Sequence, residues 1–127
     1  MAPKISEEQK EKAREKMKTI VANNLPHTSA EITFTDGYPA MPPTDGNLAV
    51  LNTFSQVSID MGHGAVEPWD PGRRGAADIS FIADYIDGID GLGTMGSGAH
   101  TPNEYLDLAT FKILTQRAAI LIYRLTR

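Results

Sequence analysis

The stretch Asp36-Gly-Tyr-Pro-Ala-Met-Pro-Pro-Thr44 decides how the chain is divided. Proline lacks the backbone N–H that a helix interior or a central strand requires, and Asp-Gly is a typical turn sequence. This segment therefore cannot continue a helix or a central strand. It predicts a boundary between two structural units, at residues 1–40 and 41–127.

Upstream of this boundary the pattern predicts a helix followed by a strand. Ser6 and Gln9 have the spacing of a capping box, and apolar residues then recur at helical spacing, which indicates a helix over about residues 7–24. Residues 28–35 alternate between apolar and polar side chains, as expected of a strand with one face in water.

Downstream of the boundary the sequence predicts mostly helices, each bounded by capping or glycine residues. The last of them has a broad apolar face that we expect to be buried. The expected elements are a helix over about 45–61 capped by Thr44 or Asp45, a short helix over 78–85, a short strand over 86–92, and a terminal helix from about Asp107.

Composition excludes several classes of protein. The chain has 12 Lys and Arg against 16 Asp and Glu, a formal net charge of -4, and no cysteine. Nucleic-acid binding is disfavoured because it needs clustered positive charge, and disulfides and thiolate metal sites are excluded. This chain has no signal peptide and no apolar run long enough to span a bilayer, so we expect a soluble protein without a membrane partner. The sequence does not indicate the cellular compartment.

The stretch Gly96-Ser-Gly-Ala-His100-Thr-Pro-Asn-Glu104-Tyr105 is the best candidate for a functional site. A glycine-rich loop can present backbone N–H groups to an anion and hold a histidine at a fixed angle. His100 is a candidate metal ligand, and Glu104 is a candidate to orient its imidazole by a hydrogen bond. The simpler interpretation is a tight connection before a helix, in which Glu104 caps the helix or faces water.

One imidazole cannot hold zinc, which takes three or four protein ligands. His27 and His63 lie near expected helix ends, where surface or capping roles are more common. No paired-ligand motif is present, so a complete metal site is not expected within this chain. Arg73 and Arg74 could bind a substrate carboxylate, although paired arginines in a Pro/Gly loop are more often only exposed.

Several segments in one order resemble the co-catalytic zinc peptidases, the family of aminoacylases, glutamate carboxypeptidases and carnosine-type dipeptidases. The matching segments are Asp36 to Thr44, Arg74-Gly-Ala-Ala-Asp-Ile-Ser80, Asp90-Gly-Leu-Gly93 and Gly96 to Tyr105. With the terminal helix that follows these segments, the resemblance extends over essentially the whole chain.

The resemblance implies that the chain is the C-terminal part of such an enzyme. Residues 1–40 would be the last helix and strand of its lid or dimerisation domain, and residues 41–127 the end of its catalytic α/β sandwich. His100 would be the last ligand of a two-zinc site, with Gly96, Ser97 and Gly98 lining the carboxylate end of a peptide or N-acyl amino acid substrate. The other ligands and the catalytic glutamate would lie upstream of residue 1. Asp78 falls where many members have Ser/Thr-Asp-Ala, altered here to Ala-Asp-Ile.

Three hypotheses remain open. The chain could be part of a zinc amidohydrolase that is inactive alone, with no catalytic residue of its own. It could be a non-catalytic module that forms a homodimer or binds a partner, because strands without neighbours expose edges that seek pairing. Between the two lies a split enzyme, completed by a separate N-terminal chain.

Overall fold

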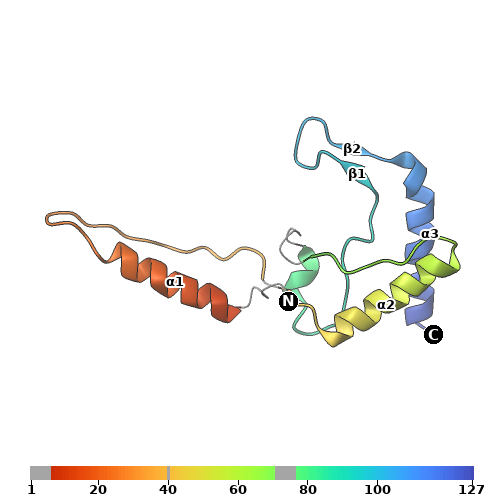
Figure 1. Ribbon diagram of the computed structural model, residues 1–127, viewed down its shortest axis with the longest axis horizontal. Coiled ribbons are helices and arrows are strands. Elements are labelled where there is room, and N and C mark those ends of the chain that lie inside the picture. Colours follow the sequence, from red (N-terminus) through yellow and green to blue (C-terminus); the bar gives the residue numbers. More distant parts are fainter. Residues whose placement is uncertain (1–6, 40, 71–76) are drawn as a thin grey trace. The chain divides into compact units, whose positions relative to one another are not determined.

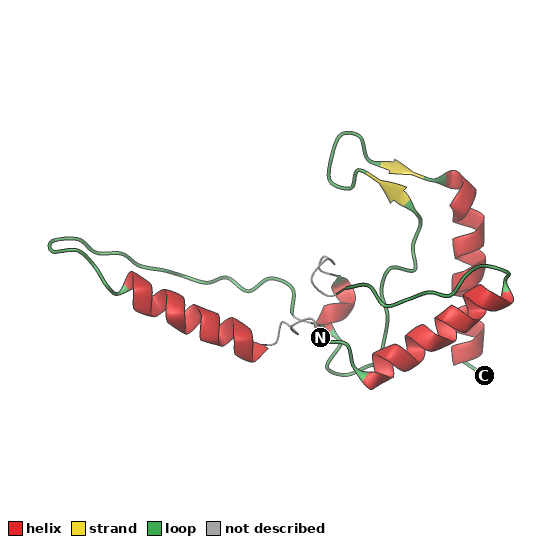
Figure 2. Ribbon diagram, viewed as in Figure 1, coloured by secondary structure: helices red, strands yellow, loops and turns green. Residues whose placement is uncertain are grey.

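The computed structural model describes residues 7–39, 41–70 and 77–127 (Figure 2). The chain divides into two compact units, residues 1–42 with 69–85 and residues 43–68 with 86–127. In chain order the elements are α1 (Glu7–Val21), α2 (Asp45–Asp60), the 3₁₀ helix η1 (Asp78–Phe81), β1 (Gly96–Ser97), β2 (Tyr105–Leu106) and α3 (Leu108–Leu125) (Figure 1). Helices with one small two-stranded sheet are the mixture expected of part of an α/β domain.

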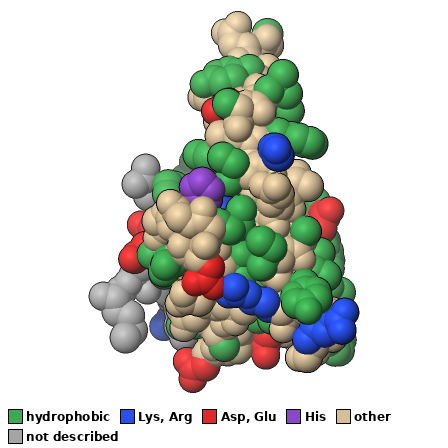
Figure 3. Space-filling model, turned by 90° about the vertical axis from the view of Figure 1, so that its right-hand side faces the viewer, with side chains coloured by type: hydrophobic (Ala, Val, Ile, Leu, Met, Phe, Trp, Pro, Cys, Tyr) green, Lys and Arg blue, Asp and Glu red, His purple; other side chains and the backbone are tan. Residues whose placement is uncertain are grey.

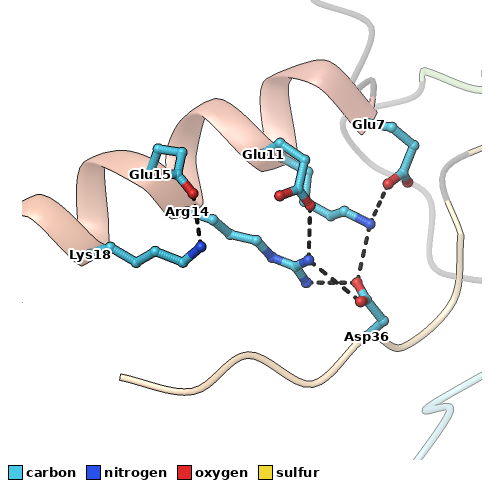
Figure 4. A network of polar contacts seen from close by, with 7 residues as sticks. Glu7, Glu11, Arg14, Glu15, Lys18 and Asp36 are labelled. Atoms are coloured by element: carbon cyan, nitrogen blue, oxygen red, sulfur yellow. Dashed lines mark hydrogen bonds and ion pairs between the residues drawn. The ribbon is translucent and has the colours of Figure 1, made fainter. Parts of the chain in front are cut away.

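In the first unit, α1 is fastened to the extended segment that follows it by charged groups around Asp36 (Figure 4). Nη2 of Arg14 donates to Oδ1 of Asp36 at 2.6 Å, and Nζ of Lys10 donates to the same oxygen at 3.1 Å. The Arg14 guanidinium also lies over the ring of Phe34, 5.2 Å from its centroid. Glu7 and Glu11 pair with these two cations along the helix.

Two predictions for this unit need correction. The helix ends at Val21 rather than near residue 24, and residues 28–35 form no strand. A strand needs a hydrogen-bonded neighbouring strand, and the backbone N–H groups beyond Thr28 bond to none of the described residues. The alternation of apolar and polar residues corresponds instead to burial without strand pairing. Ile32 and Phe34 are half-buried, whereas the residues between and around them are exposed. Ser6 lies outside the described residues.

The same unit contains η1, which is shorter than the helix predicted over 78–85. Only residues 78–81 are helical, and turns follow. Tyr38 contacts this helix twice: its hydroxyl donates to Asp78 Oδ1 at 3.0 Å, and its ring centroid lies 5.0 Å from that of Phe81. Asp78 thus binds the segment that follows Asp36 and Gly37.

In the second unit, α2 begins as predicted, and Thr44 rather than Asp45 is the capping residue. The Thr44 hydroxyl accepts from the backbone N–H of Asn47 at 3.0 Å. The helix ends at Asp60, and Gly62 follows with a φ of 80°.

The strand predicted over 86–92 is absent. Instead, the backbone N–H of Gly88 donates to the buried side-chain oxygen of Asn47 at 2.8 Å, so this segment is held against the start of α2 and not by a strand ladder. The carboxylate of Asp87 lies so close to Gly46 that a side chain there would collide with it. Glycine at position 46 allows the approach.

The core of the second unit lies between α2 and α3. Its buried side chains are Phe54, Val57, Leu114 and Leu121, with Ser58 also almost fully buried. Arg117 of α3 lies over Phe54, 4.5 Å from the ring centroid, and donates to the Ser58 hydroxyl at 3.3 Å. Arg124 donates to Asp60 at 2.5 Å.

The terminal helix starts at Leu108 with Asp107 as its cap, as predicted, but much of its apolar face is exposed. The exposed members are Leu108, Phe111, Ile122 and Leu125. Figure 3 shows one face of the molecule, on which many apolar side chains, in green, are visible at the surface. The described helices include none that is long and apolar enough to cross a membrane.

Candidate metal and substrate site

The predicted glycine-rich loop is a β-hairpin that leads directly into α3. Gly96 pairs with Leu106 and Ser97 with Tyr105 in antiparallel register. The backbone N–H of Asp107 adds a bond to the carbonyl of Met95 at 2.8 Å. Because Asp107 also caps α3, the hairpin and the helix are joined without a flexible linker.

Gly96 and Gly98 have structural reasons to be glycine. A Cβ at position 96 would collide with the carbonyl oxygen of Tyr105, and one at position 98 would lie 2.7 Å from the carbonyl oxygen of Asn103. Gly98 also has a φ of 72°, which favours glycine. The two arms of the hairpin can approach this closely because glycine has no side chain at positions 96 and 98.

His100 lies at the tip of the hairpin and is exposed. Its φ of 64° is uncommon for a residue with a side chain, although histidine tolerates it better than most. The turn is fixed by Thr101, whose backbone N–H and hydroxyl both donate to the carbonyl of Gly98, at 3.0 and 2.7 Å. These bonds fix the backbone from which the His100 side chain projects.

Glu104 does not bind the imidazole of His100, as the sequence suggested it could. Its Oε2 accepts from the backbone N–H of His100 at 3.2 Å. The carboxylate therefore supports the turn on which His100 stands and leaves the ring itself unconstrained by Glu104.

A pocket of about 350 Å³ runs along the hairpin. Gly96, Ser97 and Glu104 line it, whereas His100 and Gly98 are outside its lining. Apolar side chains of Met95, Tyr105 and Leu106 complete its walls.

Of these apolar residues, the stretch singled out from the sequence included Tyr105 but not Met95 or Leu106. The sequence signal for Leu106 was its position, with Tyr105, directly before the capping residue Asp107. Between the glycine-rich loop and a helix cap there is room for only a short strand.

Among the described residues, no group of side chains is placed to hold a zinc ion. Zinc takes three or four side-chain ligands, and no three His, Asp or Glu side chains gather in residues 7–39, 41–70 and 77–127. His27 and His63 are exposed residues of other segments. Arg73 and Arg74, the candidate carboxylate ligands, lie outside the described residues.

Comparison with known proteins places the chain among the peptidases. The family described as "Peptidase family M20/M25/M40" matches residues 2–124. The chain therefore belongs to this peptidase family. No curated protein and no solved structure matches it significantly.

Proposed function

We propose that the chain is the C-terminal part of a zinc-dependent amidohydrolase that cleaves the amide bond of peptides or N-acyl amino acids. The observation that carries this proposal is the position of His100, exposed at the tip of a fixed hairpin, in a chain that matches a peptidase family over residues 2–124. The aminoacylases, glutamate carboxypeptidases and carnosine-type dipeptidases are the candidate subfamilies.

In this proposal His100 supplies one zinc ligand, and polypeptide outside this chain supplies the others together with the catalytic glutamate. When bound, zinc polarises the amide carbonyl and makes water acidic enough to act as a nucleophile at neutral pH. The role of this chain is to place an imidazole at a defined point. The hydrogen bond from the His100 backbone to Glu104 supports that role, because it limits movement of the turn.

Gly96, Ser97 and Gly98 are proposed to contact the carboxylate end of the substrate. Gly96 and Ser97 lie along the pocket, and the Ser97 hydroxyl has no partner among the described residues. A hydroxyl donor and backbone N–H groups next to a left-handed glycine are suited to binding an anion. The lining of this pocket includes no positive side chain, and its charged side chain is the Glu104 carboxylate, so the interaction would depend on these neutral donors.

The test compares His100→Ala with His27→Ala in a complex of this chain with the upstream polypeptide of the same enzyme. His27 is a matched control, because it is also exposed and has a similar φ of 62°. We expect His100→Ala to lower the zinc content and to abolish hydrolysis of N-acyl amino acids. His27→Ala should retain both. Normal zinc content and turnover in His100→Ala would refute the ligand assignment.

A second candidate function is favoured by the segment over residues 28–36. It is extended, and its backbone N–H groups beyond Thr28 bond to none of the described residues. A row of unpaired backbone groups is a template for another strand, so the chain could serve as a non-catalytic module that forms a homodimer or binds a partner through this edge. A chain that remains a monomer over a wide concentration range in sedimentation experiments would argue against a homodimer.

A further inference from the structure

Asp-Gly sequences are prone to a spontaneous rearrangement of the aspartyl residue, and the four such sequences of this chain differ in how strongly the structure restrains it. An aspartyl side chain can be attacked by the backbone nitrogen of the next residue, and glycine permits the attack because it has no side chain in the way. The chain has such a sequence at four places, Asp36-Gly37, Asp45-Gly46, Asp87-Gly88 and Asp90-Gly91.

The carboxylate of the first site and the nucleophile of the third are already engaged. Asp36 is bound by Arg14 and Lys10, which keep its carboxylate ionised and fixed in place, whereas the attack requires a neutral, mobile carboxyl group. The backbone nitrogen of Gly88 donates its hydrogen to Asn47 Oδ1 at 2.8 Å. Attack through that nitrogen would break this bond.

The second site is restrained by helix geometry. Asp45 and Gly46 form the first turn of α2, where the helical ψ directs the next nitrogen away from the side-chain carbonyl carbon. The Asp87 carboxylate also lies against Gly46, which leaves little space for the ring that must form.

Asp90-Gly91 has none of these restraints. Both residues are exposed and belong to no helix or strand. Neither makes a hydrogen bond or an ion pair with any other described residue. The position where a Cβ of Gly91 would stand has no atom within 4 Å, and its φ is 78°. The carboxyl group and the nitrogen are therefore free to meet.

We propose that Asp90 is the site at which the folded chain converts spontaneously to isoaspartate. The Gly91 nitrogen forms a bond to Cγ of Asp90, and the carboxyl oxygen leaves as water with the nitrogen's hydrogen, giving a five-membered succinimide. Solvent water then opens the ring. Cleavage of its bond between nitrogen and the original backbone carbonyl gives isoaspartate, and cleavage at Cγ restores aspartate. The reaction takes up as much water as it releases and involves no oxidation.

The product alters the backbone just before the hairpin. The main chain is lengthened by one methylene group at residue 90, and a carboxylate takes the place of the former peptide carbonyl. Gly91 is followed closely by Met95, whose carbonyl accepts the bond from Asp107. Isoaspartate at this position is also the substrate class of repair enzymes that methylate isoaspartyl carboxylates.

The test is to age the purified, folded chain at neutral pH and locate isoaspartate by enzymatic methylation and by electron-based peptide fragmentation, which separates the two linkages. We expect isoaspartate mainly at residue 90. Asp90→Glu should lose this signal because its side chain forms the corresponding ring much more slowly. Asp84→Glu, a matched change at an exposed aspartate that precedes Tyr85, should retain it.

A sample aged in concentrated urea controls for the role of the fold. There all four Asp-Gly sequences should react to a similar extent, because the contacts that protect three of them are lost. The proposal is overturned if the folded chain accumulates isoaspartate equally at the four sites, or chiefly at another site. It is equally overturned if residue 90 remains unchanged in the folded chain while it reacts in urea.

Discussion

Arg14 and Asp36, 22 residues apart in the sequence, are joined by a hydrogen bond of 2.6 Å that fastens α1 to the segment after it. Arg14 makes the larger contribution and Lys10 the smaller in holding the pKa of Asp36 below its usual value of 3.8. A carboxyl group whose pKa is lowered by folding stabilises the fold above its unfolded pKa, and this contribution is lost as the pH falls through the folded value.

We therefore expect the contact between α1 and Asp36 to be fully present above pH 3.8 and to be lost only as the pH falls below that value through the lowered pKa of Asp36. Asp36→Asn should weaken amide protection in α1 at neutral pH and make helicity less sensitive to acid. Circular dichroism across the acid range and hydrogen exchange at neutral pH measure the two effects. Glu31→Gln removes the same charge from an exposed neighbour and should change neither.

The hairpin depends on Gly98. Gly98→Ala would place a Cβ 2.7 Å from the carbonyl oxygen of Asn103 at a φ of 72°. An alanine in the left-handed region costs about 1–2 kcal/mol before any collision is counted. We expect faster amide exchange at Ser97 and Tyr105, measured by NMR, with α2 unaffected.

Gly93→Ala is the control for this change, because its Cβ would meet no atom within 4 Å and its φ is not positive. Equal exchange rates in the two variants would contradict the structural reason given for Gly98.

Much of the helical structure could be predicted from the sequence, because it follows from local signals. Thr44 and Asp107 are capping side chains, and each begins its helix at the expected residue. Residues 28–35 and 86–92 were predicted wrongly as strands. Alternation or β-branched residues indicate only a tendency, and a strand exists only when a neighbour supplies hydrogen bonds. Residues 28–35 instead contact α1, and residues 86–92 are held by the side chain of Asn47.

The site was predicted in part. The sequence singled out Gly96 to Tyr105, and the structure brings Gly96, Ser97, Glu104 and Tyr105 to one pocket. The direction of the Glu104 carboxylate could not be predicted, because the choice between a ring nitrogen and a backbone N–H depends on the turn at His100. That turn includes a left-handed non-glycine residue, for which the sequence has no reliable signal. The assignment of residues 1–40 to a lid and 41–127 to a catalytic domain stays a prediction.

The interface between α2 and α3 offers a test with two adjacent residues. Leu121 is 3% exposed and Ile122 is 63% exposed. Leu121→Ala should lower the free energy of unfolding by about 2–5 kcal/mol, because it removes buried methyl groups and leaves a cavity. Ile122→Ala should change it by no more than about 0.5 kcal/mol, as expected of a surface site. Urea unfolding followed by circular dichroism measures both. A large loss in Ile122→Ala would show that this side of α3 is covered in solution.

The bond between Tyr38 and Asp78 can be tested by titration. Asp78 accepts from the phenol and lies close by as a negative charge, so it raises the pKa of Tyr38 above its usual value of 10.0. A group whose pKa is raised by folding stabilises the fold below its unfolded pKa, and this contribution is lost as the pH rises through the folded value.

Ultraviolet absorbance should therefore show a tyrosine ionisation above pH 10.0 that Tyr38→Phe removes. Asp78→Ala should return that tyrosine to its usual range while the ring contact with Phe81 keeps it in place. Tyr85→Phe, at an 85% exposed position, should leave the late ionisation intact. If the late ionisation persists in Tyr38→Phe, the tyrosine responsible is another one, and the Asp78 contact does not form in solution.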